Sequence, residues 1–155
     1  MRLTGDIYNA LVQTFSAERE FTEYIHSAIM FCEKPYRNSY KLLNDIYAQR
    51  VMAMDSMVED FMGNNIPETK TVLFNITLLT DMYETLRNKL FNLKMAYSEL
   101  SKMANAKQNL PIFTFATEQE SDIERRIQKI DSLRAYLKNI SSPYGALDFD
   151  QTKVK

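Results

Sequence analysis

The sequence contains few residues that break helices: three glycines and four prolines among 155 residues. Because tight turns depend on these residues, the elements between them must be long, which favours helices. The single cysteine, Cys32, excludes a disulfide within the chain and is typical of a reducing compartment. No apolar run approaches the ~20 residues of a membrane span, and the N-terminus lacks a signal-peptide pattern. We therefore predict a cytoplasmic protein, or one of the host cytoplasm if virus-encoded, with no membrane partner.

The chain also lacks an excess of charge of either sign. It has 19 Lys and Arg residues and 20 Asp and Glu residues, which give a net charge of -1. A duplex-binding protein usually carries a basic excess, so a nucleic-acid partner is not expected. The chain has one histidine, His26, and no glycine-rich phosphate loop or paired-cysteine motif. A hydrophobic content of 45% and a charged content of 25% are typical of a globular protein of one domain.

Apolar residues recur at alternating steps of three and four along four segments, which predicts four amphipathic helices. The first ends before Pro35, the second spans about 36–62 and ends at Gly63, and the third spans about 67–107. Asn65 and Glu68 are spaced as a capping box for the third helix, although the β-branched run 69–77 is where a break would fall. The fourth helix follows a second capping box at Thr117 and ends near residue 140.

Short connections between these helices predict an all-α fold, a four-helix bundle with up-down-up-down topology. The apolar stretch 109–116, which contains Pro111, is expected to be a linker. We predict one helical-bundle domain over 1–140 and a C-terminal tail over 141–155 that lies on the surface or straps the bundle. The alternative is a bundle whose second and third helices are joined by a crossover along the length of the bundle. That topology requires residues 64–79 to be extended rather than helical.

Three acidic residues are candidate metal ligands. Glu18 falls in the apolar row of the first helix, and Asp55 and Glu59 lie one turn apart on the second. A buried carboxylate without a partner costs several kcal/mol, so Glu18 requires a cation, a partner or an exposed end. Helical bundles build carboxylate metal sites by pointing such side chains inward from facing helices.

The segment KPYRNSYKLLNDIYAQRVMAMDSMVEDF, residues 34–61, resembles the second-helix region of the ferritin-like superfamily, and most of all the Dps-type mini-ferritins. Asp55 and Glu59 match that family's D-x-x-x-E, and the resemblance extends over about residues 1–62. It implies a shell-forming protein that oxidises ferrous iron, with iron or another divalent metal as cofactor. The family's site also needs two histidines. Ile29 and Lys41 stand near those positions, so we predict no ferroxidase, no enzyme activity and no cofactor.

The chain is rich in methionine, with nine residues, and has nine phenylalanines and nine tyrosines. Together these methionine and aromatic residues are more than a four-helix core of this size is expected to bury. Some of them should therefore lie on the surface as anchors of an interface. The sequence therefore predicts a non-enzymatic protein that acts by association, as a homo-oligomer or as an adaptor for a protein partner. The alternative is a degenerate ferritin-like protein that binds metal or forms a shell. The proposed interface residues are Met52, Met57, Phe113, Phe115 and Phe149.

Overall fold

The computed structural model describes residues 5–63, 66–67, 72–140 and 142–155, and every regular element within those ranges is helical. The predicted all-α class is confirmed. The elements are α1 (Gly5–Cys32), α2 (Arg37–Met57), a π-helical turn η1 (Val58–Met62), α3 (Leu79–Ala106), α4 (Leu110–Leu137) and α5 (Pro143–Thr152).

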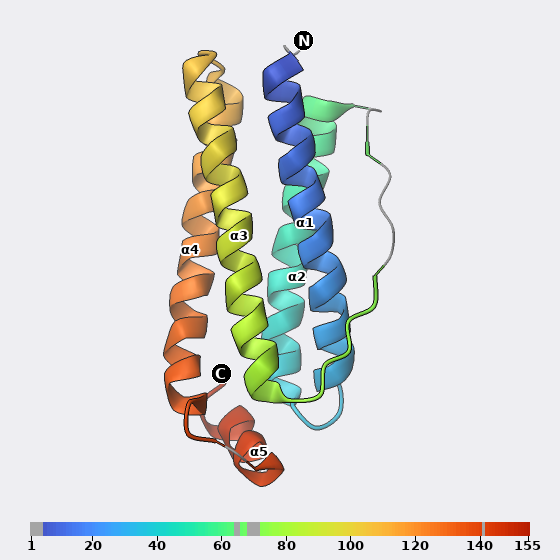
Figure 1. Cartoon of the computed structure of the whole chain (residues 1–155), viewed down its shortest axis with the longest axis vertical. Coiled ribbons are helices and arrows are strands. Elements are labelled where there is room, and N and C mark those ends of the chain that lie inside the picture. The colour runs from blue at the N-terminus through green and yellow to red at the C-terminus, as the bar shows by residue number, and fades with distance from the viewer. Residues whose placement is uncertain (1–4, 64–65, 68–71, 141) are drawn as a thin grey trace.

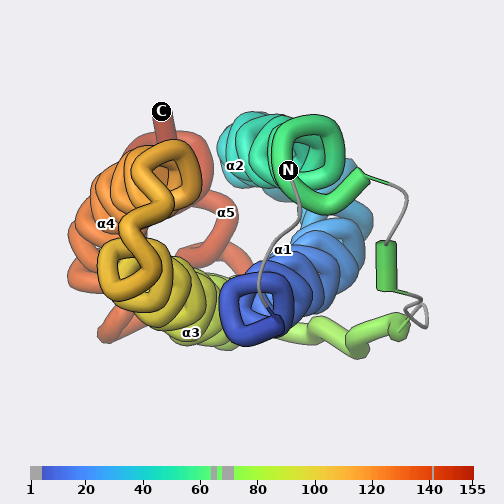
Figure 2. The backbone as a smooth tube through the Cα atoms, turned by 90° about the horizontal axis from the view of Figure 1, so that it is seen from above, coloured from blue at the N-terminus to red at the C-terminus, as the bar shows by residue number. Residues whose placement is uncertain are grey.

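The four long helices lie side by side, and α5 lies across one end of them (Figures 1 and 2). α1 packs against α2 and α3, and α3 packs against α4. Pro35 stands in the turn between α1 and α2, as predicted. Gly63 follows η1 with a positive φ of 59°, a conformation that glycine adopts without steric cost, and its N–H bonds to the Val58 carbonyl.

η1 lies at one end of the bundle and α3 begins at the opposite end, so the chain crosses the length of the bundle between them (Figure 1). Residues 72–78 are not helical, and Leu78 has extended dihedral angles, φ -128° and ψ 136°. α2 and α3 consequently run in the same direction, so the predicted helix from residue 67 and the predicted up-down-up-down order are wrong. The physical reason is that Phe74 and Ile76 pack on the core at strand spacing, which a helical reading of the apolar pattern missed. The proposed capping box at Asn65 and Glu68 lies outside the described residues.

From Leu79 onward the predicted apolar row of the third helix is confirmed. Its members form the centre of the core, and each is no more than 2% exposed: Leu79, Tyr83, Leu86, Leu90, Leu93, Tyr97 and Leu100. Full burial of one leucine side chain contributes ~1.5–3 kcal/mol of transfer free energy, so this row is a main source of stability. Val72, which was predicted to belong to the same row, is 48% exposed because the helix has not yet begun.

The predicted linker 109–116 is instead the first two turns of α4. Asn109 caps the helix through a hydrogen bond of 3.2 Å from the Ile112 N–H to its side chain. Pro111 then lies in the first turn of the helix, where the backbone N–H that a proline lacks would have no partner within the helix. Thr117, proposed as the cap, lies inside the helix, where its hydroxyl bonds to the Phe113 carbonyl at 3.0 Å.

The C-terminal tail contains α5, which the apolar pattern did not predict, and which packs against α2 and α4. Asp150 on α5 is 1% exposed and accepts hydrogen bonds from the backbone N–H of Asn38, at 3.1 Å, and of Ser39, at 2.7 Å. The N-cap residue of α2, Tyr36, makes no capping bond of its own. A carboxylate 112 positions along the chain from Asn38 therefore caps this helix.

We expect Asp150→Ala to lower the free energy of unfolding by about 1–3 kcal/mol, because two N–H groups of a helix terminus lose their acceptor. Urea denaturation monitored by circular dichroism measures this change. Asp148→Ala is the matched control, because its exposed side chain lies on the same helix. Equal losses in the two variants would contradict the capping role.

Candidate functional site

At the centre of the molecule each of the four long helices contributes one polar side chain. Arg50 of α2 lies 3.3 Å from Glu18 Oε1 of α1, and its second terminal nitrogen donates to Gln119 Oε1 of α4 at 2.7 Å. Tyr97 of α3 completes the group, since the charges of Glu18 and Arg50 both act on the pKa of its hydroxyl. Glu18, Arg50 and Tyr97 are at most 1% exposed.

The apolar pattern did not identify Arg50 as a buried partner of Glu18, although the sequence contains a signal for it. Arg50 occupies the gap between Tyr47 and Met54 in the three-four row of the second helix. The buried Glu18 requires a cation or a partner, as expected, and Arg50 is that cation. An arginine in an apolar row and a glutamate in the row of the neighbouring helix form a pattern that predicts a buried pair.

Burial raises the pKa of the Glu18 carboxyl to about 7, because loss of solvation outweighs the attraction of Arg50. Burial, followed by the negative charge of Glu18, also raises the pKa of Tyr97 well above its usual value. Glu18 Oε2 and the Tyr97 hydroxyl form no hydrogen bond of good geometry with any described residue. The centre is thus a buried polar cluster of high energetic cost.

The structure does not bring the three proposed metal ligands together. Glu18 points to Arg50, whereas Asp55 and Glu59 are exposed and line a surface pocket of about 430 Å³ between α1 and α2. Glu23 and His26 of α1 line the same pocket, together with apolar side chains such as Val51 and Met54. Among the described residues, no group of three or more His, Cys, Asp or Glu side chains is placed to hold a metal ion.

Two of the five proposed interface residues are buried within the chain, and for these the prediction is wrong. Met57 is 0% exposed in the core, and Phe149 is 2% exposed against the Tyr83 ring. Phe113 and Phe115 are half-buried, whereas Met52 is 69% exposed and accessible. The sequence could not separate these cases, because Phe149 lies on α5, an element that the apolar pattern does not predict and whose packing buries this ring against Tyr83.

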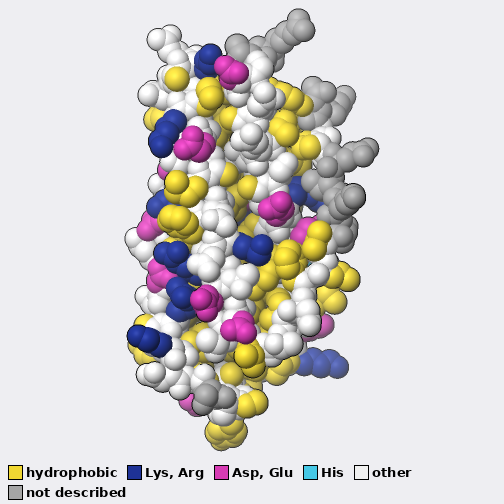
Figure 3. Space-filling model, viewed as in Figure 1, with side chains coloured by type: hydrophobic (Ala, Val, Ile, Leu, Met, Phe, Trp, Pro, Cys, Tyr) yellow, Lys and Arg dark blue, Asp and Glu magenta, His cyan; other side chains and the backbone are white. Residues whose placement is uncertain are grey.

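The most exposed large apolar side chains instead include several on the connection between α2 and α3. Leu73 is 79% exposed and Leu78 is 57% exposed, with Ile66 and Val72 near half. Apolar side chains gather over the lower part of this connection on the face shown in Figure 3. Elsewhere the exposed apolar residues are more scattered: Met30, Tyr47, Met52, Phe91, Met95, Leu110, Tyr136 and Tyr144.

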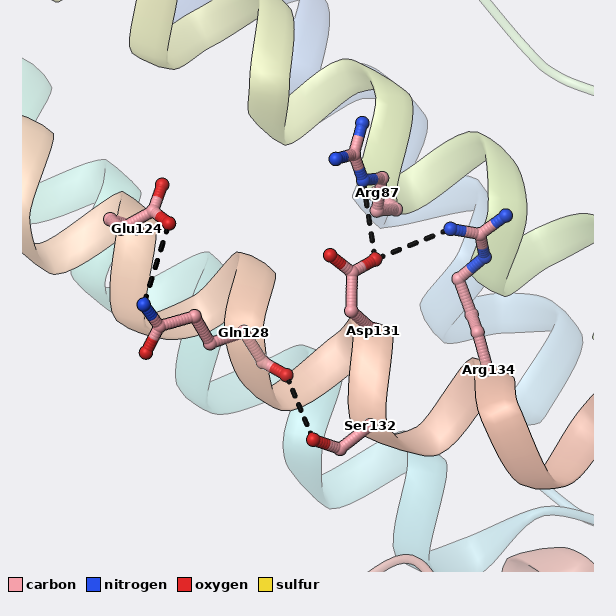
Figure 4. A network of polar contacts seen from close by, with 6 residues as sticks. All are labelled: Arg87, Glu124, Gln128, Asp131, Ser132 and Arg134. Carbon is pink, nitrogen blue, oxygen red and sulfur yellow. Dashed lines mark hydrogen bonds and ion pairs between the residues drawn. The ribbon is translucent and has the colours of Figure 1, made fainter.

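The outer face of α3 and α4 carries a charged network rather than a site. Asp131 accepts hydrogen bonds from Arg87 and Arg134, each at 3.2 Å, and Glu124 accepts one from Gln128 (Figure 4). All of these side chains are exposed or half-exposed, so the network is a solvated connection between two helices.

No protein-family model matches this sequence, and no curated protein matches it significantly. In the described part of the chain, none of the helices combines the length and apolar character that crossing a membrane requires.

The pKa of Glu18 predicts a specific pH dependence of stability. The pKa of the Glu18 carboxyl is 4.5 in the unfolded chain and about 7 in the folded protein. Its favourable contribution to the free energy of unfolding is therefore complete below pH 4.5. It is lost as the pH rises to 7, because the unfolded chain releases this proton first, and the loss amounts to about 3 kcal/mol. Glu18→Gln should remove this decline, and Glu20→Gln, an exposed residue of the same helix, should retain it.

Urea unfolding at several pH values between 4.5 and 8 measures the free energy of each variant. A wild-type protein whose pH profile overlays that of Glu18→Gln would show that Glu18 is ionised throughout this range, contrary to this account.

Proposed function

We propose that this protein is non-enzymatic and acts by associating with protein, through the exposed connection between α2 and α3. The observation that carries the proposal is the apolar surface of this segment, where Leu73 and Leu78 are 79% and 57% exposed. Exposed apolar side chains that gather on one segment are typical of interaction sites. Within 72–78 no residue is charged, so water solvates this stretch poorly.

The chemistry of the centre supports a role that does not depend on metal. Carboxylate metal sites in helical bundles lie where side chains from facing helices converge, which here is the position of Glu18 and Arg50. The guanidinium stays charged at all relevant pH values and repels a metal cation. A catalytic carboxylate would also need access to substrate, and Glu18 is 0% exposed.

The second candidate is a degenerate ferritin-like bundle, and a specific observation favours it. α2 and α3 run in the same direction, so the chain between them has to cross the length of the bundle, as that topology requires (Figure 1). On this reading the fold is ferritin-like, and Arg50 replaces the metal at the centre. Asp55 and Glu59 would then be remnants of the family's D-x-x-x-E, located in the surface pocket.

Site-directed photo-crosslinking tests the association function. A photoreactive amino acid at position 73, in cells that naturally contain the protein, should form a defined crosslinked protein product. Position 92 on α3 is the control, because Asn92 is exposed but does not belong to the apolar segment. Absence of a product at 73, or the same products at both positions, would contradict the proposal.

Metal analysis distinguishes the two candidates. We expect wild type and the double variant Asp55→Asn, Glu59→Gln to contain the same trace of iron or zinc after equilibration with each metal and dialysis. A stoichiometric metal in the wild type that is lost in the double variant would instead support the metal-binding alternative.

A further inference from the structure

The backbone of residues 72–78 is almost without hydrogen bonds to the described part of the chain. The Phe74 N–H donates to Ser27 Oγ at 3.2 Å, and the Leu78 carbonyl accepts from the Met82 N–H at 3.0 Å. The other N–H and carbonyl groups of this segment have no partner among the described residues. An extended segment with free donors and acceptors presents the same groups as the edge strand of a sheet.

Packing holds one side of this segment in place. The Phe74 ring lies against Tyr24, with 5.3 Å between centroids, and Lys89 lies 4.9 Å from the same ring. The neighbouring Ile76 also packs on the core, while Leu73, Asn75 and Thr77 between and beside them are exposed. Since adjacent residues of a strand direct their N–H and carbonyl groups to opposite edges, the groups of Leu73, Asn75 and Thr77 face away from Ser27.

This edge carries none of the features that prevent strand pairing. Exposed edge strands are usually blocked by a charged residue, a proline or a bulge. Residues 72–78, VLFNITL, contain neither a charge nor a proline, and valine, isoleucine and threonine favour strands. The partner that fits such an edge is another uncharged extended strand, because main-chain hydrogen bonds supply the affinity.

We propose that residues 72–78 pair with the same residues of a second copy of this chain, as an antiparallel two-stranded ladder about a two-fold axis at Asn75. In that register the exposed Leu73 lies opposite Thr77 of the second copy, and the two Asn75 side chains face each other. No like charges are opposed, and the paired amides can bond reciprocally. An identical strand is present wherever the protein is, so no other partner has to be supplied.

This inference rests on the proposed function, since it names the partner at the same surface. The experiment compares wild type, Leu73→Lys, Asn75→Pro and Leu110→Lys by sedimentation velocity over a range of micromolar concentrations. Leu110 is the matched control because its side chain is 70% exposed and lies at the start of α4. Asn75→Pro removes one N–H that has no partner among the described residues and lies outside every helix, so the monomer should keep its fold.

We expect the wild type and Leu110→Lys to form the same dimer. Leu73→Lys and Asn75→Pro should raise its dissociation constant about tenfold or more, since each change occurs twice in a symmetric dimer. Unchanged circular dichroism and thermal midpoints would show that the variants remain folded. If either variant is unfolded, the other provides the comparison.

A wild type that remains monomeric at all concentrations overturns the inference, as does a dimer that neither variant weakens. These failures are distinct from failure of the proposed function. A crosslinked product at position 73 with a different protein would support association while rejecting the self-paired strand.

Discussion

The length of the connection between α2 and α3 is the constraint on which the rest of the structure depends. The two helices run in the same direction, so the chain must return along the whole bundle before α3 begins (Figure 1). The 28 residues of α3 span about 42 Å at 1.5 Å each. Residues 63–78 cover about 50 Å when extended at ~3.3 Å each, but only about 24 Å as a helix. Residues 72–78, the described part of the connection that leads into α3, are accordingly not helical, and most of their backbone groups have no partner among the described residues.

A buried polar cluster joins three of the four long helices. Glu18, Arg50 and Gln119 join α1, α2 and α4, and the apolar row of α3 packs beside them. A buried ion pair adds little net stability, but removing one partner leaves an uncompensated charge. The cluster consequently favours the register of the helices in which Glu18 meets Arg50. At the start of α2, Asp150 of α5 caps the helix by accepting a hydrogen bond from the Ser39 N–H.

Much of the fold could be predicted from the apolar pattern. The rows from Leu79 to Leu100 and from Ile123 to Leu137 are buried as expected, and Pro35 and Gly63 mark the ends of helices. The connection could not be predicted in this way, because Val72 and Ile76 fit a helical row and a strand equally well. The candidate site was predicted only in part. Glu18 was recognised as a buried acid, but its partner depends on which face of α2 meets α1, and that depends on tertiary packing.

The proposed function depends on the same crossing, because residues 72–78 form an uncharged, largely exposed and non-helical segment on the surface. Amide hydrogen exchange of residues 72–78 tests this account most directly, because exchange reports whether each N–H has acquired a partner. The account predicts that the amides of Leu73, Asn75 and Thr77 exchange rapidly in dilute protein and become protected as the concentration rises. Rapid exchange of these amides at every concentration would contradict it.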